Sequence, residues 1–173
     1  MAYKILLTGA TGGIGSAIKN RLKNHELTCV ARPNFAINTD GEFDWLICAH
    51  GIIDENNVLE TFKANVISNI ILIKTIKAKK IIFISSTAAF KGNGLFPVYS
   101  ASKAALNMYA QILARERECY VIAPGPTDTE MWRKLGLEGQ AQDPDEVAKV
   151  VQLVINGEFK NGQLITIRNG IVI

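Results

Sequence analysis

The chain has 173 residues, of which 48% are hydrophobic and 20% charged, and its formal net charge is +3 with a pI near 8.8. A chain of this length can bury about 70% of the surface that its unfolded form exposes, so we expect one domain over residues 1–173 and exclude a disordered protein. The basic residues are dispersed apart from Lys77, Lys79 and Lys80. This distribution is typical of a solvated surface and disfavours a nucleic-acid partner.

Three cysteines and the first apolar run bear on the location of the protein. Cys29, Cys48 and Cys119 are far apart and form no CxxC motif, which predicts buried thiols in a reducing compartment. The apolar run after Lys4 stops at Gly9, too soon for a signal peptide or a membrane span. We therefore expect a cytoplasmic protein with no membrane partner and no metal site.

Short apolar runs alternate with amphipathic segments along the chain. The expected strands are residues 3–8, 27–31, 45–49, 80–85, 120–123 and 164–168, and the expected helices are residues 14–24, 57–77, 99–116 and 147–156. Asp143 is the expected N-cap before the last helix, with Pro144 at the first helical position, and Asn169-Gly170 is an expected turn. The alternation predicts an α/β fold, a doubly wound parallel sheet (Rossmann fold) with helices on both faces.

The connection between the second and third of these strands is short. Only 13 residues separate Ala31 from Trp45. At about 3.3 Å per extended residue they suffice for a crossing and a short strand at residues 35–37, entered through a loop of Pro33 and Asn34. They do not also suffice for a full helix. We therefore expect the sheet to be shortened between strands 2 and 4, counting the short strand as strand 3.

The segment TGATGGIG, residues 8–15, joins the first expected strand to the first expected helix. Gly9 would allow a tight turn, Gly13 would let a pyrophosphate approach the backbone, and Gly15 would let the helix lie close to the strand. The N–H groups at the start of the helix could then bind phosphate. The alternative is a plain glycine-rich turn, because three residues separate Gly9 from Gly13 where the motif GxGxxG has only one.

A second group of residues suggests acid–base chemistry. Tyr99 and Lys103 lie four residues apart near the start of an expected helix, so their side chains share a face. An ammonium beside a phenol lowers a pKa that starts near 10, and such a tyrosine can exchange a proton with a hydroxyl or carbonyl. Ser86 ends an expected strand and could hydrogen-bond the same oxygen. The alternatives are a surface contact for the Tyr–Lys pair and a capping role for the serine.

These features follow the order of the short-chain dehydrogenase/reductase family, which the chain resembles from Lys4 onwards. The matching motifs are TGATGGIG at the glycine loop, Cys48-Ala49-His50-Gly51 at the Asn-Asn-Ala-Gly loop, Asn65 at the helix asparagine, Ser86 at the catalytic serine, Tyr99 and Lys103 at Tyr-x-x-x-Lys, and Pro124-Gly125 followed by Thr129. The resemblance implies an oxidoreductase that interconverts a small-molecule carbonyl and alcohol by hydride transfer. The implied catalytic residues are Ser86, Tyr99, Lys103 and Asn65; in the family the asparagine position bends its helix and holds a water of a proton relay.

The resemblance also implies a nicotinamide cofactor. The implied cofactor-binding residues are Gly9, Thr11, Gly13, Ile14, Gly15, Arg32, Asp40, Ala49, Gly51, Tyr99, Lys103, Pro124, Gly125, Thr127 and Thr129. Arg32 follows the second expected strand, where a carboxylate would bind the ribose hydroxyls of NAD and an arginine suits the 2′-phosphate of NADP. We therefore expect NADP, with NAD as the second choice, although Arg32 could also be a solvated loop residue.

Several departures from the family pattern leave another function open. Cys48 and Ala49 replace two asparagines that brace the sheet in the family, His50 replaces a small residue, and the chain is shorter than usual by several helical segments. The side chains expected at the substrate wall and lid favour a partly apolar substrate; they are Phe90, Leu95, Phe96, Met131, Trp132, Leu135 and Leu137. The main alternative is a regulatory or interaction protein that binds the cofactor with little or no turnover.

The helices expected at residues 57–77 and 99–116 are apolar over a wider arc than one contact with a sheet requires. In the second helix the apolar residues are Ala101, Ala104, Ala105, Met108, Ile112 and Leu113. Members of the family commonly pair through these two helices. The resemblance therefore implies a homodimer or a homotetramer.

Overall fold

The computed structural model describes residues 2–31, 41–137 and 139–172. Within these ranges the strands form one sheet in the order β2-β1-β3-β4-β5-β6-β7. The strands are β1 (Lys4–Thr8), β2 (Glu26–Val30), β3 (Glu42–Cys48), β4 (Lys77–Ile84), β5 (Glu118–Pro124), β6 (Leu164–Arg168) and β7 (Ile171–Val172). Neighbouring strands pair in parallel, except that β7 pairs antiparallel with β6. The predicted turn at Asn169-Gly170, with φ values of 51° and 73°, joins β6 to β7.

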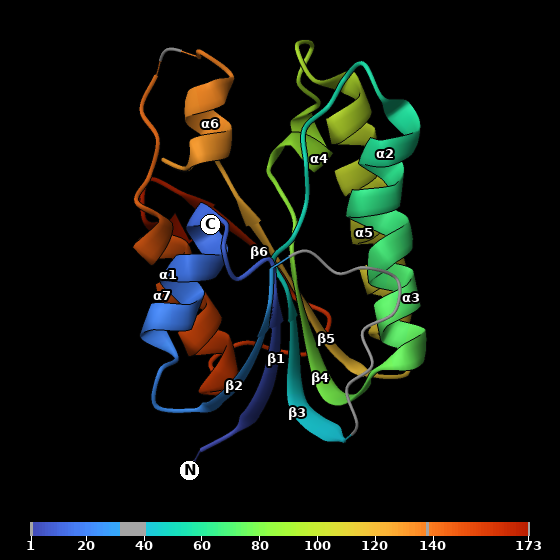
Figure 1. Cartoon of the computed structure of the whole chain (residues 1–173), viewed down its shortest axis with the longest axis vertical. Helices are drawn as coiled ribbons and strands as arrows, with labels where there is room; N and C mark the ends of the chain where they lie inside the picture. Colours follow the sequence, from blue (N-terminus) through green and yellow to red (C-terminus); the bar gives the residue numbers. More distant parts are fainter. Residues whose placement is uncertain (1, 32–40, 138, 173) are drawn as a thin grey trace.

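Helices cover both faces of this sheet, as Figure 1 shows. They are α1 (Gly13–Arg21), α2 (Val58–Phe62), α3 (Ser68–Thr75), α4 (Ala88–Lys91), α5 (Pro97–Leu113), α6 (Glu130–Lys134) and α7 (Pro144–Ile155), with a π-helical turn at Lys63–Ile67 between α2 and α3. Helices α1 and α7 lie on one face, and α2, α3 and α5 lie on the other. No helix in the described ranges is long and apolar enough to cross a membrane. The arrangement confirms the predicted doubly wound α/β fold.

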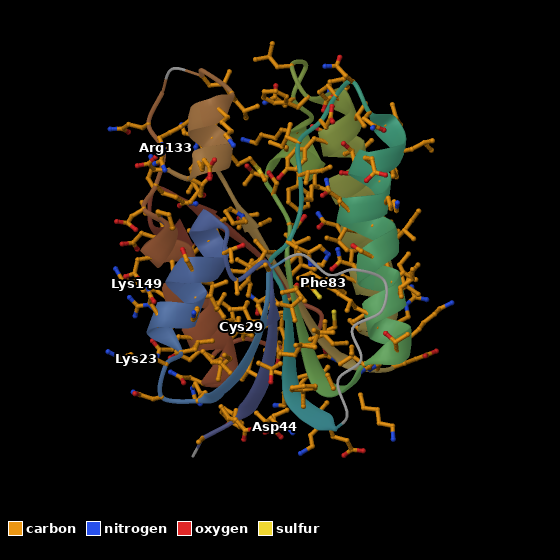
Figure 2. The ribbon with its side chains drawn as sticks, viewed as in Figure 1. Lys23, Cys29, Asp44, Phe83, Arg133 and Lys149 are labelled. Atoms are coloured by element: carbon orange, nitrogen blue, oxygen red, sulfur yellow. The ribbon has the colours of Figure 1, made fainter. Side chains whose placement is uncertain are left out.

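Each face of the sheet has its own hydrophobic core, because successive side chains of a strand point to opposite faces. Ile5 and Leu7 of β1 pack with residues of α1 and α7, whereas Leu6 between them packs with residues of α3 and α5. Phe83 of β4 points towards this second layer (Figure 2), where its ring meets the ring of Tyr109 in an edge-on contact with 6.3 Å between centroids. The two cores fix the sheet between the helical layers.

The topology brings the expected functional segments to the carboxyl ends of the strands. Strand β1 pairs with β2 on one side and with β3 on the other, so the connections that follow β1 and β3 diverge. In open parallel sheets such a reversal of strand order creates a crevice beyond the carboxyl ends of the strands. The glycine loop follows β1, and residues 49–57 follow β3. Both segments therefore begin at this crevice.

Several predicted elements differ from the observed ones. The helix expected at residues 57–77 is divided by the π-helical turn and ends at Thr75, and α5 begins at Pro97 instead of Tyr99. The short elements α4, α6 and β7 were not predicted, since four or five residues or fewer give no readable periodicity. The strand expected at residues 35–37 and the loop of Pro33 and Asn34 lie outside the described residues.

The prediction of three buried thiols was right for two of them. Cys48 and Cys119 are buried, and burial raises the pKa of both thiols, that of Cys119 to about 12. Cys29 is exposed. The prediction for Cys29 was wrong because β2 pairs with β1 alone among the described strands, so its outer side chains lack the cover of a second neighbour.

Candidate active site

The glycine loop makes a tight turn between β1 and α1. Gly9 has a φ of +70°, and a Cβ at this position would lie 2.7 Å from backbone atoms of Ala49 and His50. A Cβ on Gly15 would lie 2.0 Å from the carbonyl oxygen of Gly9, so the helix begins directly against the turn. Gly12 is the N-cap of α1 and provides no side-chain hydrogen bond. The first turn of the helix thus presents its N–H groups without a side-chain cap.

Gly13 lies against the start of α6. A Cβ on Gly13 would be 2.5 Å from Cγ2 of Thr129. Thr129 is the N-cap of α6, and its Oγ1 accepts a hydrogen bond from the N–H of Trp132 at 3.2 Å. Helix α6, which lies in the expected lid, therefore packs against the glycine loop. Gly13 is needed for this packing as well as for the approach of a phosphate, which is the only role that the sequence suggested.

A cleft of 850 Å³ extends along the glycine loop and adjoins a cavity of 510 Å³. The predicted cofactor residues that line the cleft are Gly9, Thr11, Gly13, Ile14, Gly15, Ala49, Gly51 and Thr129. Those that line the cavity are Ile14, Tyr99, Pro124, Gly125, Thr127 and Thr129. The two spaces are continuous, since both are lined by Ile14, Ile53, Thr129, Met131 and Leu135. Lys103 lines neither space, and Arg32 and Asp40 lie outside the described residues.

Three of the predicted catalytic residues come together at the cavity. The hydroxyl of Ser86 hydrogen-bonds the phenol of Tyr99 and also accepts the N–H of Ala88 at 3.2 Å. Lys103, one helical turn after Tyr99, is 4% exposed and places its Nζ 5.7 Å from the centre of the Tyr99 ring. Its ammonium donates a hydrogen bond to the carbonyl of Ile84 at 3.0 Å. Lys103 thus lies beneath the cavity wall that Ser86 and Tyr99 form.

Burial governs the protonation of this group. It raises the pKa of Tyr99 to about 12, although the hydrogen bond from Ser86 acts in the opposite direction. Burial also lowers the pKa of Lys103 to about 8. The expectation that Lys103 lowers the pKa of Tyr99 was wrong for the chain alone, because desolvation of the phenolate outweighs every stabilising contact. At neutral pH the phenol is therefore protonated and is a proton donor.

Asn65 lies in the π-helical turn and connects the loop after β3 to α5. Its Nδ2 donates hydrogen bonds to the carbonyl of Ile52 and to Oγ of Ser102, both at 2.9 Å, and its Oδ1 accepts the N–H of Ile52 at 2.8 Å. A Cβ on Gly51 would lie 2.9 Å from Oδ1 of Asn65 and 3.3 Å from Nζ of Lys103. Asn65 and Lys103 therefore lie on either side of Gly51. The hydrogen bonds of the Asn65 amide hold the loop after β3 against α5.

His50 joins β1 to α3. Its Nδ1 lies 2.7 Å from Oγ1 of Thr8 and its Nε2 lies 2.8 Å from Oγ of Ser68, and the residue is buried. These hydrogen bonds occur where Cys48 and Ala49 replace the amides expected to brace the sheet. Within the described ranges, no three His, Cys, Asp or Glu residues are grouped so as to hold a metal ion. The contacts of His50 are thus structural ones.

Helix α5, which carries Tyr99 and Lys103, is capped from a distant loop. Its N-cap is Phe96 and its first residue is Pro97, and neither provides a cap. The carboxylate of Glu55 accepts the N–H groups of Val98 and Tyr99, both at 2.9 Å. The sequence analysis missed Glu55. The sequence feature that indicates such a residue is Phe96-Pro97 at the start of the helix. Neither side chain can accept a hydrogen bond from the first N–H groups, so the acceptor must come from another segment.

The cavity has apolar walls and a basic rim. Of the predicted wall and lid residues, it is lined by Phe90, Phe96, Met131, Trp132 and Leu135. Leu95 and Leu137 are not part of its lining, and Leu95 is 65% exposed. The lining contains two charged residues that the sequence analysis did not single out, Lys91 and Arg168.

Comparison with known proteins identifies the family. The family model described as short chain dehydrogenase matches residues 34–140. Carbonyl reductase family member 4 of Danio rerio is 33% identical over 104 residues, which cover 53% of this chain and 44% of that protein. The fold is similar to a short chain dehydrogenase family protein from Francisella tularensis (TM-score 0.86, 21% identity, 98% of both chains) and to a short chain dehydrogenase from Burkholderia cenocepacia in complex with NADP (TM-score 0.80, 22% identity, 96% of both chains). Since the family model spans more than half of its length, the chain belongs to the short-chain dehydrogenase family.

Proposed function

We propose that the chain is an NADP(H)-dependent oxidoreductase that interconverts a carbonyl and an alcohol. The observation that supports this proposal best is the placement of Ser86 and Tyr99. Their hydrogen-bonded hydroxyl groups line a cavity that opens into the glycine-lined cleft, and Lys103 lies directly behind them. A substrate oxygen in the cavity would meet a proton donor and a second hydroxyl on the same wall.

In the direction of reduction, Tyr99 donates its proton to the carbonyl oxygen as the carbon accepts a hydride. The raised pKa of about 12 keeps the phenol protonated at neutral pH. Ser86 hydrogen-bonds the same oxygen and stabilises the negative charge that develops there. Lys103, with a pKa lowered to about 8, is a stronger acid than an ordinary lysine, so it can return a proton towards the phenolate. Asn65 and Glu55 hold the elements that carry these groups.

The glycine loop fits a dinucleotide. Added Cβ atoms at Gly9, Gly13 and Gly15 would meet neighbouring atoms at 2.7, 2.5 and 2.0 Å, so only glycines leave this cradle open. The N-terminus of α1 would bind the pyrophosphate. NADPH, when bound, supplies the hydride. The similar protein from Burkholderia cenocepacia, which is in complex with NADP, supports the choice of cofactor.

The preference for NADP over NAD rests on Arg32, which lies outside the described residues. An arginine at the end of the second strand suits a 2′-phosphate. In the variant Arg32→Ala we expect the affinity for NADPH to fall by about tenfold or more, with little change for NADH. Fluorescence titration of both cofactors measures this difference, and equal losses for the two would defeat the assignment.

The alternative is a protein that binds the cofactor and regulates or recruits a partner with little turnover. The replacement of the loop asparagines by Cys48 and Ala49 favours it. The discriminating experiment measures NADPH consumption with a panel of aldehydes, ketones and quinones, alongside NADPH binding. Turnover of any member supports the oxidoreductase, whereas tight binding with no turnover across the panel supports the alternative.

We further propose that residues 1–173 act as one catalytic domain that assembles into a homodimer or homotetramer. The support is a set of exposed apolar side chains on α2, the π-helical turn and α5. Its largest exposed side chains are Val58, Leu59, Ile67, Met108 and Ile112, which are between 47% and 81% exposed. Members of the family commonly pair through helices at these positions.

A further inference from the structure

We infer that the carbonyl substrate has an aromatic or otherwise apolar body and carries an anionic group, a carboxylate in the simplest case. This inference rests on the proposed function, because it concerns the same cavity. It is drawn from the composition of the cavity lining, in which apolar walls are combined with positive charges and with no negative ones.

The walls of the cavity suit a flat apolar body. Phe90 and Phe96 line it from the segment that follows β4, and Met131 and Trp132 line it from α6. Aromatic rings and a thioether form favourable contacts with an aromatic ligand. Because the reacting wall with Ser86 and Tyr99 belongs to the same cavity, a substrate of this kind would place its carbonyl and its ring in one continuous space.

The charged residues of the lining are Lys91 and Arg168, and no Asp or Glu of the described ranges lines the cavity. Neither of these two cations forms an ion pair with a described residue. Several other basic residues of the same chain do have carboxylate partners, for example Arg133 with Asp128 at 2.6 Å, near the same lid. Among the described residues, no acidic side chain therefore lies within ion-pairing distance of either cation.

The two cations reach the cavity from different elements. Lys91 is the last residue of α4, which follows β4, and Arg168 is the last residue of β6. Strand β5 lies between β4 and β6 in the sheet. Arg168 packs beside the Pro-Gly loop, where a Cβ on Gly125 would lie 3.7 Å from its Cγ. The cavity thus carries one positive charge on each side of the carboxyl end of β5.

The two cations provide the contacts that an anionic group needs. Lys91 contributes an ammonium and Arg168 a guanidinium to the lining. Both groups bind carboxylates through charge-assisted hydrogen bonds, and a guanidinium can do so with two parallel bonds. The cavity therefore combines two anion-binding groups with apolar walls.

The test compares 4-carboxybenzaldehyde with its methyl ester, which has the same aldehyde and ring but no charge. We expect kcat/KM for the acid to exceed that for the ester by about tenfold at low salt, a typical value for charge-assisted contacts at a partly exposed site, and the ratio to fall in 0.5 M NaCl. In the double variant Lys91→Gln, Arg168→Gln the ratio should approach one. Lys23→Gln is the matched control, since this exposed lysine lies near the amino end of β2, at the opposite end of the strands from α4 and α6 (Figures 1 and 2).

Three results would overturn the inference while leaving the proposed function intact. They are an equal kcat/KM for acid and ester in the natural chain, an undiminished ratio in the double variant, and a loss of NADPH affinity in the double variant that accounts for the change. The proposed function fails only if no member of the wider panel of aldehydes, ketones and quinones is reduced. If neither of these two aldehydes is reduced, calorimetry with 4-(hydroxymethyl)benzoate and its methyl ester in the presence of NADPH tests the anion preference by itself, and equal affinities would refute it.

Discussion

Lys103 is a buried cation, and its burial has a cost for the stability of the fold. It is 4% exposed, and the hydrogen bond recorded for its ammonium goes to the carbonyl of Ile84. Burial therefore lowers its pKa from 10.5 to about 8. A buried ammonium with few partners destabilises the folded chain, so we expect Lys103 to lower the stability of the fold.

The variant Lys103→Met tests this cost. We expect its free energy of unfolding at pH 7 to exceed that of the natural chain by about 1–3 kcal/mol, while turnover is lost. Between pH 8 and pH 10.5 the unfolded natural chain binds more protons at this residue than the folded chain does, so natural stability rises with pH. The advantage of the variant should shrink over this window. Urea unfolding at several pH values measures it, and a variant that is less stable at pH 7 would refute the argument.

At the residue scale, the sequence identified the candidate catalytic residues, Asn65 among them, but not Glu55 and Ser102, which hold the same elements. Ser86, Tyr99 and Lys103 each belong to a motif whose chemistry can be read from the sequence, and the structure brings the three together. Glu55 and Ser102 have no such motif, since their roles depend on contacts with residues 44 and 37 positions away in the chain. The raised pKa of Tyr99 also could not be predicted from the sequence, because burial is a property of the packed structure and not of the spacing between two residues.

At the scale of elements, the position of Tyr99 depends on how the first turn of α5 is held. Glu55 accepts the N–H groups of Val98 and Tyr99, which Phe96 and Pro97 leave uncapped. We expect Glu55→Ala to lower the free energy of unfolding by about 1–2 kcal/mol, as the loss of a helix cap does, and to lower kcat several-fold. The KM for NADPH should change less than kcat, because Glu55 itself does not line the cofactor cleft.

Kinetics and amide hydrogen exchange check this prediction. Exchange at Val98 and Tyr99 should accelerate in Glu55→Ala. The exposed Glu116, in the turn after α5, provides the control variant Glu116→Ala. Unchanged kcat together with unchanged exchange at Tyr99 would show that the cap does not position the catalytic helix.

The π-helical turn shows why some elements cannot be predicted from periodicity. Its residues continue the apolar pattern of the flanking helices, so the sequence suggested one helix. The turn is stabilised by side chains: Ser68 donates to the carbonyl of Ala64 at 2.7 Å and Asn69 donates to the carbonyl of Asn65 at 2.9 Å. Such donors also occur in ordinary helices, and only the packing against Ile52 and α5 selects the wider turn.

At the scale of the whole molecule, the fold leaves apolar side chains of α2, the π-helical turn and α5 exposed. Met108 and Ile112 of α5 are 58% and 54% exposed. We expect the double variant Met108→Glu, Ile112→Glu to be monomeric, because two carboxylates would be desolvated in the proposed interface. Light scattering measures the mass. A monomeric natural chain would contradict the proposal, and so would an unchanged oligomer in the variant.

The overall architecture was predictable because it follows from the alternation of apolar runs and amphipathic helices, a signal that strands β1 to β6 and the long helices carry. The lid was less predictable. Thr129 was expected to contact the cofactor, but its role as the cap of α6 depends on a helix of five residues, which is too short to give a period.

The central claim is that Tyr99 donates the proton while the cofactor donates a hydride to the same carbonyl. The most direct measurement uses NADPH that carries deuterium at both C4 positions and an aldehyde substrate, with mass spectrometry of the alcohol. The natural chain should give an alcohol with one deuterium on the former carbonyl carbon. Tyr99→Phe should give no alcohol while still binding NADPH. An unlabelled alcohol from the natural chain, or labelled alcohol from Tyr99→Phe at the natural rate, would contradict the claim.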